Sequence, residues 1–484
     1  MTHNPPLSAL PPRALTLELT KGCNLRCGYC YYAAREDAYD PATTMSPEVA
    51  ERSVDLLLTE GVADQPVHLH LFGGEPLMNF KLVQHVVNYG LRRADEESRA
   101  ITFELTTNGT RFSERIIEFL NQHSIQVGVS FDGPPHVQDD SRPAINGSSY
   151  EMADAGIRAF LASRKGTQLM VKTHCSVVVT RRELDLVAIV EHLEAMGFEH
   201  VILSPATDLS GQNHGLTESD LPTILASYDA LAERYEQRRR DGQPTSVVFF
   251  DTLMDRLLSG QRKTRFCGGG VDYLGVASDG SMSLCYRFYQ DDGFGMGNVV
   301  DGIDRSVTQQ LENEGLEKRL TCGTCWARYF CGGGCHHENL ITTGSLGEPN
   351  PVTCEILRHS MNHTLEIFGR ESSRGVAAQI PSPATTSEEQ MTLDQGIEMG
   401  DRPATKPTCH IREVGDERVV YEPGVHEVAF LNTTATWLFE QCDGTRSVQD
   451  LLTAMLDRFE APEEVLRKDL LATLGLFQSR GLLA

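Results

Sequence analysis

Short apolar runs rich in β-branched residues alternate with longer amphipathic stretches from residue 14 to about residue 207. Runs of this length and composition predict β-strands, and the stretches between them are long enough for α-helices. The predicted strands are Ala14–Thr20, Val67–Phe72, Ile101–Thr107, Gln126–Phe131, Val171–Val179 and His200–Pro205. Strands that alternate with helices form parallel sheets covered by those helices. The pattern therefore predicts an α/β fold built from repeated βα units.

Polar or glycine-rich turns follow four of these strands. They are Lys21-Gly22-Cys23, Gly73-Gly74-Glu75, Asn108-Gly109 and Asp132-Gly133. In βα barrels the loops after the carboxyl ends of the strands build the active site. We therefore expect these turns to meet at one mouth of the barrel.

The hydrophobic periodicity weakens near Phe266, and cysteine and glycine dominate as far as Cys354, which is typical of a small metal-stapled module. Residues 371–406 are rich in Ser, Thr, Pro, Ala and acidic residues and predict a flexible linker. Strand-like pieces follow around His410 and Val419. Three helices are predicted next, at Thr433–Gln441, Ser447–Phe459 and Pro462–Arg480. This last segment predicts a small winged-helix-like α+β domain.

Composition limits the class of protein. The formal net charge of −24 disfavours a nucleic-acid or anionic-membrane partner, since phosphate binding needs clustered Lys and Arg. No apolar run approaches the roughly 20 residues of a membrane span, and the opening segment does not resemble a secretory signal, so we expect a cytoplasmic protein. The 13 cysteines are odd in number and unevenly placed, which favours metal ligation over disulfides.

Three of these cysteines, Cys23, Cys27 and Cys30, lie on one loop directly after the first strand. A [4Fe–4S] cluster suits soft thiolate ligands, and three of them leave one iron open. The alternative is a zinc loop, which normally needs a fourth Cys or His. His3 and His68 are available for that role.

The spacing of these cysteines, their position after the first strand, and Tyr29 before the last of them resemble the radical S-adenosylmethionine (SAM) family. This resemblance implies a partial (β/α)6 TIM barrel over residues 14–260, with a flexible N-terminus at 1–13. It also implies that Cys23, Cys27 and Cys30 hold a [4Fe–4S] cluster whose open iron binds SAM. One-electron reduction then releases a 5′-deoxyadenosyl radical, which takes a hydrogen atom from the substrate.

The resemblance extends to other residues of the predicted mouth. Phe72-Gly73-Gly74-Glu75-Pro76 is similar to the motif that binds the SAM amino group in this family, and Ser130 and Arg142 are similar to the ribose and carboxylate contacts. Thr106, Thr107 and Asn108 end the third strand and are expected at the same mouth. A strand end followed by an Asn-Gly turn explains these three residues almost equally well.

A second cysteine field resembles the SPASM extension of radical SAM peptide maturases, here residues 261–370. The resemblance gives one fully ligated auxiliary cluster to Cys322, Cys325, Cys331 and Cys354, and a second to Cys267, Cys285 and Cys335. With three thiolates, the second cluster has room for a substrate thiolate, unless Asp272, a His or water closes it. Taken alone, the Cys322-to-Cys335 run is equally typical of a zinc ribbon. Three [4Fe–4S] clusters and SAM are thus the expected cofactors.

Residues 407–484 resemble the PqqD-like peptide-recognition domains, in the run Phe430-Leu431-Asn432-Thr433-Thr434-Ala435 and in Cys442-Asp443-Gly444-Thr445. The resemblance implies that a leader peptide adds a strand to the sheet edge. From Lys406 onward there are 8 basic and 13 acidic residues, a balance of 8 − 13 = −5, which disfavours DNA binding by a winged helix. A structural or dimerising role is the remaining alternative.

Together the modules resemble a radical SAM/SPASM maturase that crosslinks a ribosomally made peptide or small protein. A Cys thioether to an acceptor carbon is the expected product, with carbon–carbon crosslinking or another oxidation as the enzymatic alternative. A metal-stapled scaffold is the non-enzymatic one. The expected partners are the precursor and an electron donor such as flavodoxin or ferredoxin, without nucleic acid or membrane. Asp132 and Glu104 are candidates for the catalytic acid or base by position only.

Overall fold

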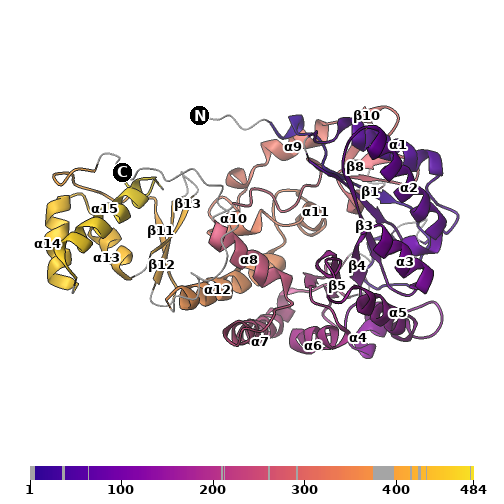
Figure 1. Cartoon of the computed structure of the whole chain (residues 1–484), viewed down its shortest axis with the longest axis horizontal. Coiled ribbons are helices and arrows are strands. Elements are labelled where there is room, and N and C mark those ends of the chain that lie inside the picture. The colour runs from indigo at the N-terminus through magenta and orange to yellow at the C-terminus, as the bar shows by residue number, and fades with distance from the viewer. Residues whose placement is uncertain are drawn as a thin grey trace. The chain divides into compact units, whose positions relative to one another are not determined.

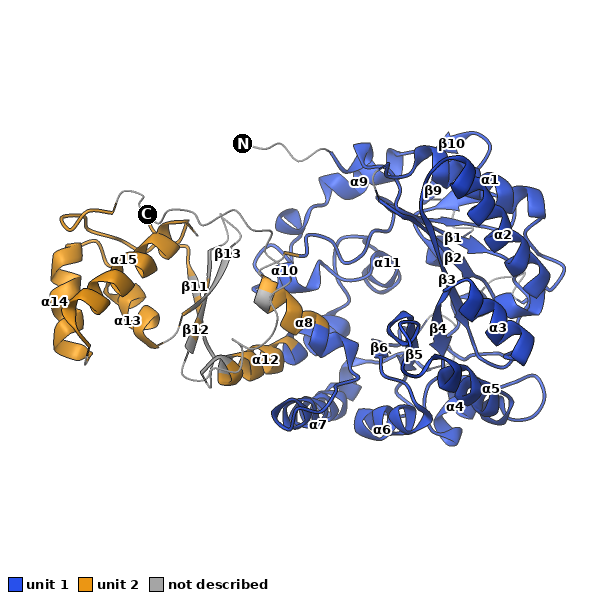
Figure 2. Cartoon of the chain, viewed as in Figure 1, with its two compact units in different colours: residues 1–251, 263–360 blue, residues 252–262, 361–484 orange. Residues whose placement is uncertain are grey.

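The computed structural model describes residues 6–34, 39–63, 65–208, 211, 213–259, 262–289, 293–373, 397–414, 417–422, 427–431, 433–459, 461–479 and 481–484. Figure 1 shows the order of the elements along the chain. The chain divides into two compact units, residues 1–251 with 263–360 and residues 252–262 with 361–484 (Figure 2). Most of the predicted linker, residues 374–396, lies outside the described residues.

A parallel sheet forms the core of the first unit. Its six strands are β1 (Ala14–Glu18), β2 (Val67–Phe72), β3 (Ile101–Thr107), β4 (Gln126–Ser130), β5 (Thr173–Val179) and β6 (Val201–Pro205). They pair in sequence order and all run parallel. The six predicted strands are therefore confirmed, two of them at both ends and the other four with one end that differs by one or two residues. The predicted α/β fold is confirmed as well.

Helices follow the strands and cover the outer face of this sheet (Figure 1). They are α1 (Pro47–Glu60), α2 (Phe80–Glu96), α3 (Glu114–Gln122), α4 (Pro135–Ser141), α5 (Ser149–Arg164) and α6 (Leu186–Met196). Two more helices, α7 (Leu221–Arg240) and α8 (Val248–Ser259), follow β6 in the chain. Several begin at a side-chain cap, because a side-chain oxygen satisfies an amide of the first turn. Ser46 caps α1, Ser148 caps α5 and Asp185 caps α6. The helices α1, α2, α3, α5 and α6 each bury apolar side chains.

The cysteine-rich region extends the same sheet, which the sequence pattern did not predict. Strand β7 (Tyr273–Val276) pairs parallel to β1, and β8 (Ser281–Ser283), β9 (Gly295–Asn298) and β10 (Gly302–Ile303) continue it antiparallel. The helices α9 (Ser306–Asn313), α10 (Arg328–Cys331), α11 (His336–Thr343) and α12 (Pro351–Ser373) follow. These strands are only two to four residues long, too short for a periodic pattern to predict.

Short 3-10 helices connect several elements: Leu7–Ala9, Tyr31–Ala34, Pro76–Asn79, Met170–Lys172, Glu218–Asp220, Tyr286–Phe288 and Leu316–Lys318. The first lies in the segment predicted to be a flexible N-terminus. The amide of Leu7 donates to Glu312 Oε1 at 3.0 Å, and Arg305 Nη2 donates to the carbonyl of Leu10 at 3.0 Å. Residues 7–10 are thus attached to the cysteine-rich region, and residues 1–5 lie outside the described residues.

The second unit contains the predicted C-terminal domain. An antiparallel sheet of β11 (His410–Val414), β12 (Glu417–Glu422) and β13 (Glu427–Leu431) precedes α13 (Thr433–Gln441), α14 (Val448–Arg458) and α15 (Glu463–Ser479). The three predicted helices are confirmed, and Ser447 with Asp450 forms a capping box at α14. Leu438, Leu451 and Phe477 lie in its buried core. This domain therefore has an apolar core of its own.

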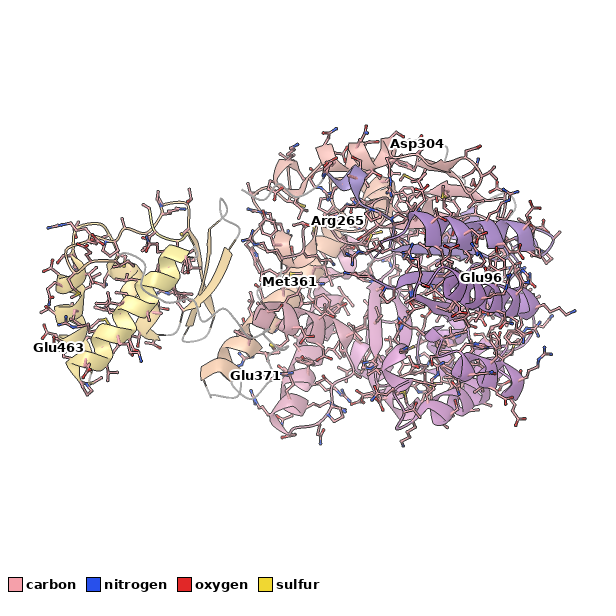
Figure 3. All side chains as sticks on the ribbon, turned by 45° about the horizontal axis from the view of Figure 1, so that its top comes forward. Glu96, Arg265, Asp304, Met361, Glu371 and Glu463 are labelled. Atoms are coloured by element: carbon pink, nitrogen blue, oxygen red, sulfur yellow. The ribbon has the colours of Figure 1, made fainter. Side chains whose placement is uncertain are left out.

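Acidic residues outnumber basic ones, with 67 Asp and Glu against 43 Lys and Arg. Glu96, Asp304 and Glu463, labelled in Figure 3, are exposed acidic residues from different parts of the chain. Among the described helices, none is both long enough and apolar enough to cross a bilayer.

Candidate active site

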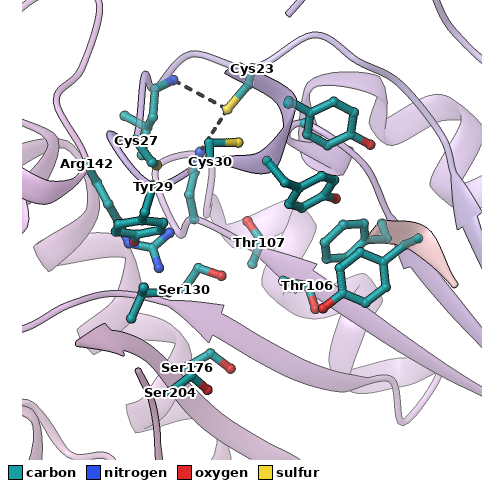
Figure 4. Close-up of a pocket in the computed structure, with 18 of the residues that line it drawn as sticks. Cys23, Cys27, Tyr29, Cys30, Thr106, Thr107, Ser130, Arg142, Ser176 and Ser204 are labelled. Atoms are coloured by element: carbon teal, nitrogen blue, oxygen red, sulfur yellow. Dashed lines mark hydrogen bonds between the residues drawn. The ribbon is translucent and has the colours of Figure 1, made fainter. Parts of the chain in front are cut away.

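A cavity of about 380 Å³ opens at the carboxyl ends of the parallel strands (Figure 4). Its volume lies in the range of small-molecule sites. The predicted residues that line it are Cys23, Cys27, Tyr29, Cys30, Gly73, Gly74, Glu104, Thr107, Asn108, Ser130 and Arg142. Glu75, Pro76 and Asp132 were predicted for the site but do not line the cavity. The expectation that the turns meet at one mouth therefore holds for most of these residues.

The three cysteines of the first loop lie above the strand ends (Figure 4). Cys23 Sγ accepts hydrogen bonds from the amide of Leu25 at 3.4 Å and from Asn108 Nδ2 at 3.9 Å. Burial raises the pKa of Cys23 to about 12, and the nearby Glu75 and Cys30 add to that effect. Thiols in such surroundings ionise only beside a strong cation. A loop of three such thiols fits a metal cluster that supplies this positive charge.

Two glycines position this loop against the end of β2. Gly73 has φ +137°, and a Cβ there would lie 2.4 Å from the carbonyl oxygen of Thr20. A Cβ at Gly74 would lie 2.4 Å from the carbonyl oxygen of Gly22. The amide of Gly74 instead donates to Thr20 at 2.7 Å. Only glycine allows two backbones to approach so closely.

The carboxylate of Glu75 holds the ends of β2 and β3 together. It is fully buried and accepts from the amide of Leu77 at 3.0 Å, Thr107 Oγ1 at 2.8 Å and the amide of Asn108 at 2.7 Å. Burial raises the pKa of Glu75 despite these donors. A carboxylate has about four acceptor positions, so one is left beyond these three. The SAM contact predicted for Glu75 stays a prediction, and the structure adds a positioning role.

Asp132 holds Arg142 at the edge of the cavity. Arg142 Nε lies 2.9 Å from Asp132 Oδ2, and Arg142 Nη2 donates to Oδ1 at 3.1 Å. Tyr29 Oη and the amide of Val178 also donate to this carboxylate, at 2.6 and 2.9 Å. Asp132 is fully buried and outside the cavity lining. Its position therefore favours orientation of Arg142 and Tyr29 over the acid or base role predicted for it.

An aromatic wall completes one side of the cavity, and sequence reasoning missed most of it. Tyr31, Tyr32, Tyr39, Phe72 and Tyr286 contribute to it. Ring centroids lie 4.6 Å apart between Phe72 and Tyr286. Arg287 lines the cavity beside them. The signal in the sequence was the position of Tyr31 and Tyr286 directly after Cys30 and Cys285.

Polar side chains line the cavity deeper in the barrel. His70, His174, Ser176 and Ser204 are among them, beside the predicted Glu104 and Thr106. Alternation along the strands could have revealed this set, since side chains of one strand point alternately to opposite faces. Burial also alternates along β2 and β5. The interior of this barrel is therefore polar where the outer face of the sheet is apolar.

The second cysteine field forms two spatial groups. Burial raises the pKa of Cys285 to about 12, and the Cys335 and Cys267 thiols add to this shift. Burial likewise raises the pKa of Cys354 to about 12, with contributions from the Cys331, Cys322 and Cys325 thiols. The four thiols of the second group also line one small pocket. The structure thus brings together the cysteines that the sequence assigned to each auxiliary site, and their ligand roles stay a prediction.

The direction of Cys175 on β5 is settled by its contacts. This residue is fully buried, its Sγ donates to the carbonyl of Phe131 at 3.2 Å, and it does not line the cavity. Its neighbour Ser176 does line the cavity. Cys175 therefore points away from the lumen.

Two known protein families match this chain, one in each of its two units. Residues 17–179 match the family model described as the radical SAM superfamily, and residues 417–483 match coenzyme PQQ synthesis protein D (PqqD). The serine-type anaerobic sulfatase-maturating enzyme of Bacteroides thetaiotaomicron is 34% identical over 348 residues, which cover 68% of this chain and 83% of that one.

Two solved structures share the fold. Native anSMEcpe with bound AdoMet has a TM-score of 0.62 at 21% identity, covering 75% of this chain and 100% of that chain. Streptococcus suis SuiB bound to the precursor peptide SuiA has a TM-score of 0.50 at 16% identity, covering 70% and 75%. At these identities the likeness concerns the fold alone.

Proposed function

Because the chain belongs to the radical SAM superfamily and ends in a PqqD domain, we propose that it matures a ribosomally made peptide or small protein by forming an intramolecular crosslink. The main support for this proposal is that residues beside both cysteine regions line one cavity. Tyr31, next to Cys30 of the first loop, and Tyr286, next to Cys285 of the second field, line the same space. A substrate segment in that space is within reach of both cysteine sites.

Cys23, Cys27 and Cys30 would hold a [4Fe–4S] cluster that binds SAM. When bound and reduced, this pair supplies a 5′-deoxyadenosyl radical that removes a hydrogen atom from the substrate. Arg142, oriented by Asp132, offers a guanidinium suited to the SAM carboxylate. Ser130 and Asn108 also line the cavity and offer hydrogen bonds to the remaining polar groups of SAM.

The second field would hold two further [4Fe–4S] clusters, three in total. Cys322, Cys325, Cys331 and Cys354 offer four thiolates to one of them. Cys267, Cys285 and Cys335 offer three to the other. The carboxylate of Asp272, the candidate for closing that site, lies 3.9 Å from Arg265 Nη2. Because Asp272 already forms this ion pair, we favour a cluster site at Cys267, Cys285 and Cys335 that keeps one position for a substrate thiolate.

We favour a thioether between a substrate Cys and a carbon of an acceptor residue. The three-cysteine group beside the cavity supports this choice, because thiolates are the ligands that iron prefers there. Carbon–carbon crosslinking, with the auxiliary clusters in electron transfer only, is the second candidate. The relative from Bacteroides thetaiotaomicron is named for maturing sulfatases, which supports a protein substrate.

Residues 407–484 would hold the leader of the precursor. The matched PqqD domain and the fold shared with SuiB, solved with its precursor peptide, support a peptide partner. An extended leader pairing with an edge of the β11–β13 sheet gains main-chain hydrogen bonds. A flavodoxin or ferredoxin would supply the electron.

The test is anaerobic reconstitution of the full chain with iron and sulfide, followed by SAM, a reductant and candidate precursor peptides read from small open reading frames near the gene. We expect 5′-deoxyadenosine and a product lighter by two hydrogens. Absence of 5′-deoxyadenosine in the wild type, at full iron loading, would overturn the enzymatic proposal. The variant C23A/C27A/C30A is the control and should still bind the leader.

Alkylation with iodoacetamide separates the two products. A thioether removes the reactive substrate thiol, so the product should resist alkylation. A product that loses two hydrogens and is still alkylated at every Cys would contradict the thioether and support the carbon–carbon crosslink.

A further inference from the structure

Glu104 is the only carboxylate among the described residues that line the cavity. It lies on β3 three residues before Thr107, about 10 Å along the strand from the mouth. Burial raises the pKa of Glu104, but the hydrogen bond with His68 and the neighbouring histidines outweigh burial and lower this pKa to about 2. Glu104 therefore carries a full negative charge at neutral pH. So low a pKa disfavours the acid or base role predicted for it.

One oxygen of this carboxylate is available to a ligand. Glu104 Oε2 lies 3.1 Å from His68 Nε2, and His68 Nδ1 lies 2.9 Å from Thr102 Oγ1. A neutral imidazole with its proton on Nε2 satisfies both contacts, because Nδ1 then accepts from the Thr102 hydroxyl. Within the described part of the chain, Glu104 Oε1 forms neither a hydrogen bond nor an ion pair. The charge of Glu104 is thus not balanced by a protein cation in this tautomer.

The hydroxyl of Thr106 offers a second acceptor beside Glu104. Thr16 Oγ1 donates to Tyr273 Oη at 2.7 Å, so its lone pair accepts from His70 Nδ1 at 3.2 Å. His70 Nε2 then accepts from Thr106 Oγ1 at 2.8 Å. Burial lowers the pKa of His70 to about 4, which keeps the ring neutral at pH 7, as this chain of hydrogen bonds requires. Because Thr106 uses its only proton here, it has only lone pairs left for a ligand.

A glycine on β4 makes room for His174 next to these acceptors. Gly128 pairs with Thr106 on one side and with His174 on the other, and a Cβ at Gly128 would lie 2.7 Å from His174 Nε2. Ser176 and Ser204 lie across the cavity from the three cysteines of the first loop (Figure 4). We define the floor of the cavity as Glu104, Thr106, His174, Ser176 and Ser204. This floor contains one carboxylate and neither Lys nor Arg.

The positive charges of the cavity lie elsewhere. Its two guanidiniums belong to Arg142, near Cys27, and to Arg287, near Cys285. Thiolates are anions, so each guanidinium has a negative neighbour when the cysteines hold a cluster. The lining therefore places its positive charge at the two cysteine sites and its negative charge, Glu104, on the floor.

We propose that the floor binds the basic side chain of a Lys or Arg residue of the substrate, and that Glu104 determines this specificity. The inference rests on the proposed function, which makes the substrate a peptide or small protein. The ammonium of Lys has three donors and no acceptor, which complements Glu104 Oε1 and Thr106 Oγ1. Its flexible four-carbon stem lets the substrate backbone stay nearer the first cysteine loop. An uncharged side chain in the same place would leave the carboxylate without a partner.

The first test uses a candidate precursor read from a small open reading frame near the gene. Each Lys and Arg of its core is replaced in turn by norleucine, which has the apolar stem of Lys without the charge. Fluorescence anisotropy of the labelled peptides gives their Kd for the reconstituted full chain, with SAM and without reductant. We expect one replacement to raise the Kd by about 10-fold or more in the wild type, and by less than about 2-fold in E104Q.

Two results of this test would overturn the inference. One is a precursor core without Lys or Arg. The other is a set of replacements that change the Kd of the wild type and E104Q equally, including no change in either. The proposed function fails separately, if the wild type forms no 5′-deoxyadenosine at full iron loading, because the binding test needs no reaction.

Reversal of the charge separates recognition from a structural effect. E104K should bind the precursor in which the recognised basic residue is replaced by Glu more tightly than the original precursor, which is the opposite of the wild-type preference. Loss of a merely structural contact would weaken both peptides alike, and that outcome in folded E104K would contradict the inference. If E104K does not fold, the comparison of E104Q with the wild type decides.

A carboxylate on the outside of the barrel serves as the control. Glu51 Oε1 lies 2.8 Å from His85 Nε2, between α1 and α2, and both side chains are more than a third exposed. E51Q removes one negative charge and the partner of a histidine, as E104Q does, but away from the cavity. It should keep the wild-type preference for the basic residue over norleucine. If E51Q loses this preference as E104Q does, the effect is one of net charge and the inference is wrong.

Discussion

Tyr31 and Tyr286, which each follow a cysteine of a different group, face each other with ring centroids 5.7 Å apart. The two residues come from distant parts of the chain: Tyr31 follows the first cysteine loop, and Tyr286 follows β8. Pairing of β7 with β1 brings these two segments together. The contact explains how one cavity lies beside both the first cysteine loop and the nearer auxiliary group.

Because the auxiliary cysteines form two separate groups, substitution of one cysteine should remove the iron of its own cluster only. C335A should remove the cluster held with Cys267 and Cys285, about one third of the iron, and leave the other two clusters intact. Iron analysis and electron paramagnetic resonance of the reconstituted protein measure this. C442A, at a buried cysteine of the C-terminal domain, is the control and should keep all the iron. Loss of two clusters in C335A would contradict the grouping.

The ion pair between Asp132 and Arg142 predicts a large stability effect for D132N. The substitution leaves a buried guanidinium without its carboxylate, which costs about 3–5 kcal/mol in the free energy of unfolding. Denaturant unfolding of the apoprotein measures it, and SAM affinity of the reconstituted protein should fall as well. The exposed pair of Glu48 and Arg52 offers the comparison, since E48Q should cost about 0.5 kcal/mol or less. Equal costs would exclude a special role for Asp132.

The partly buried His70 predicts that the stability of the protein falls between about pH 6.5 and pH 4. Burial lowers the pKa of His70 from 6.5 to about 4, so the unfolded chain binds a proton in this range and the folded chain does not. Stability attributable to His70 is therefore lost as the pH falls, by about 3 kcal/mol over the whole range. Unfolding of the wild type and H70Q at pH 7 and pH 4.5 should show a smaller pH effect in H70Q. An equal effect in both proteins would contradict this assignment.

Close packing behind the first cysteine loop predicts that Gly28 tolerates no side chain. A Cβ there would lie 2.0 Å from His214 Nε2, and His214 is 5% exposed. We expect G28A to displace the imidazole and to lower the free energy of unfolding by about 1–3 kcal/mol. The control is G295A, where a Cβ meets no atom within 4 Å. Thermal unfolding of the two apoproteins gives the comparison, and similar values would show that the loop can adjust.

Much of the fold can be predicted from the sequence because each βα unit has its own local pattern of apolar and polar residues. The run Val67–Phe72 and the helix after it carry their own periodicities, so strand, helix and parallel pairing could be predicted without distant contacts. The cysteine spacings were equally local, since ligands on one loop must lie close together. The short strands β7 to β10 lack such a pattern, and they form because β1 offers an unpaired edge.

The sequence by itself determined that Cys23, Cys27 and Cys30 share a loop at the mouth of a parallel sheet, that a second cysteine field follows, and that a PqqD-like segment comes after it. Tertiary structure decided which carboxylates meet the cavity. Asp132 follows the end of β4 and Glu104 lies in the middle of β3, yet Asp132 is enclosed by Arg142 and Tyr29 while Glu104 lines the cavity. The physical reason is that a carboxylate's role depends on the donors around it, and these donors come from other strands.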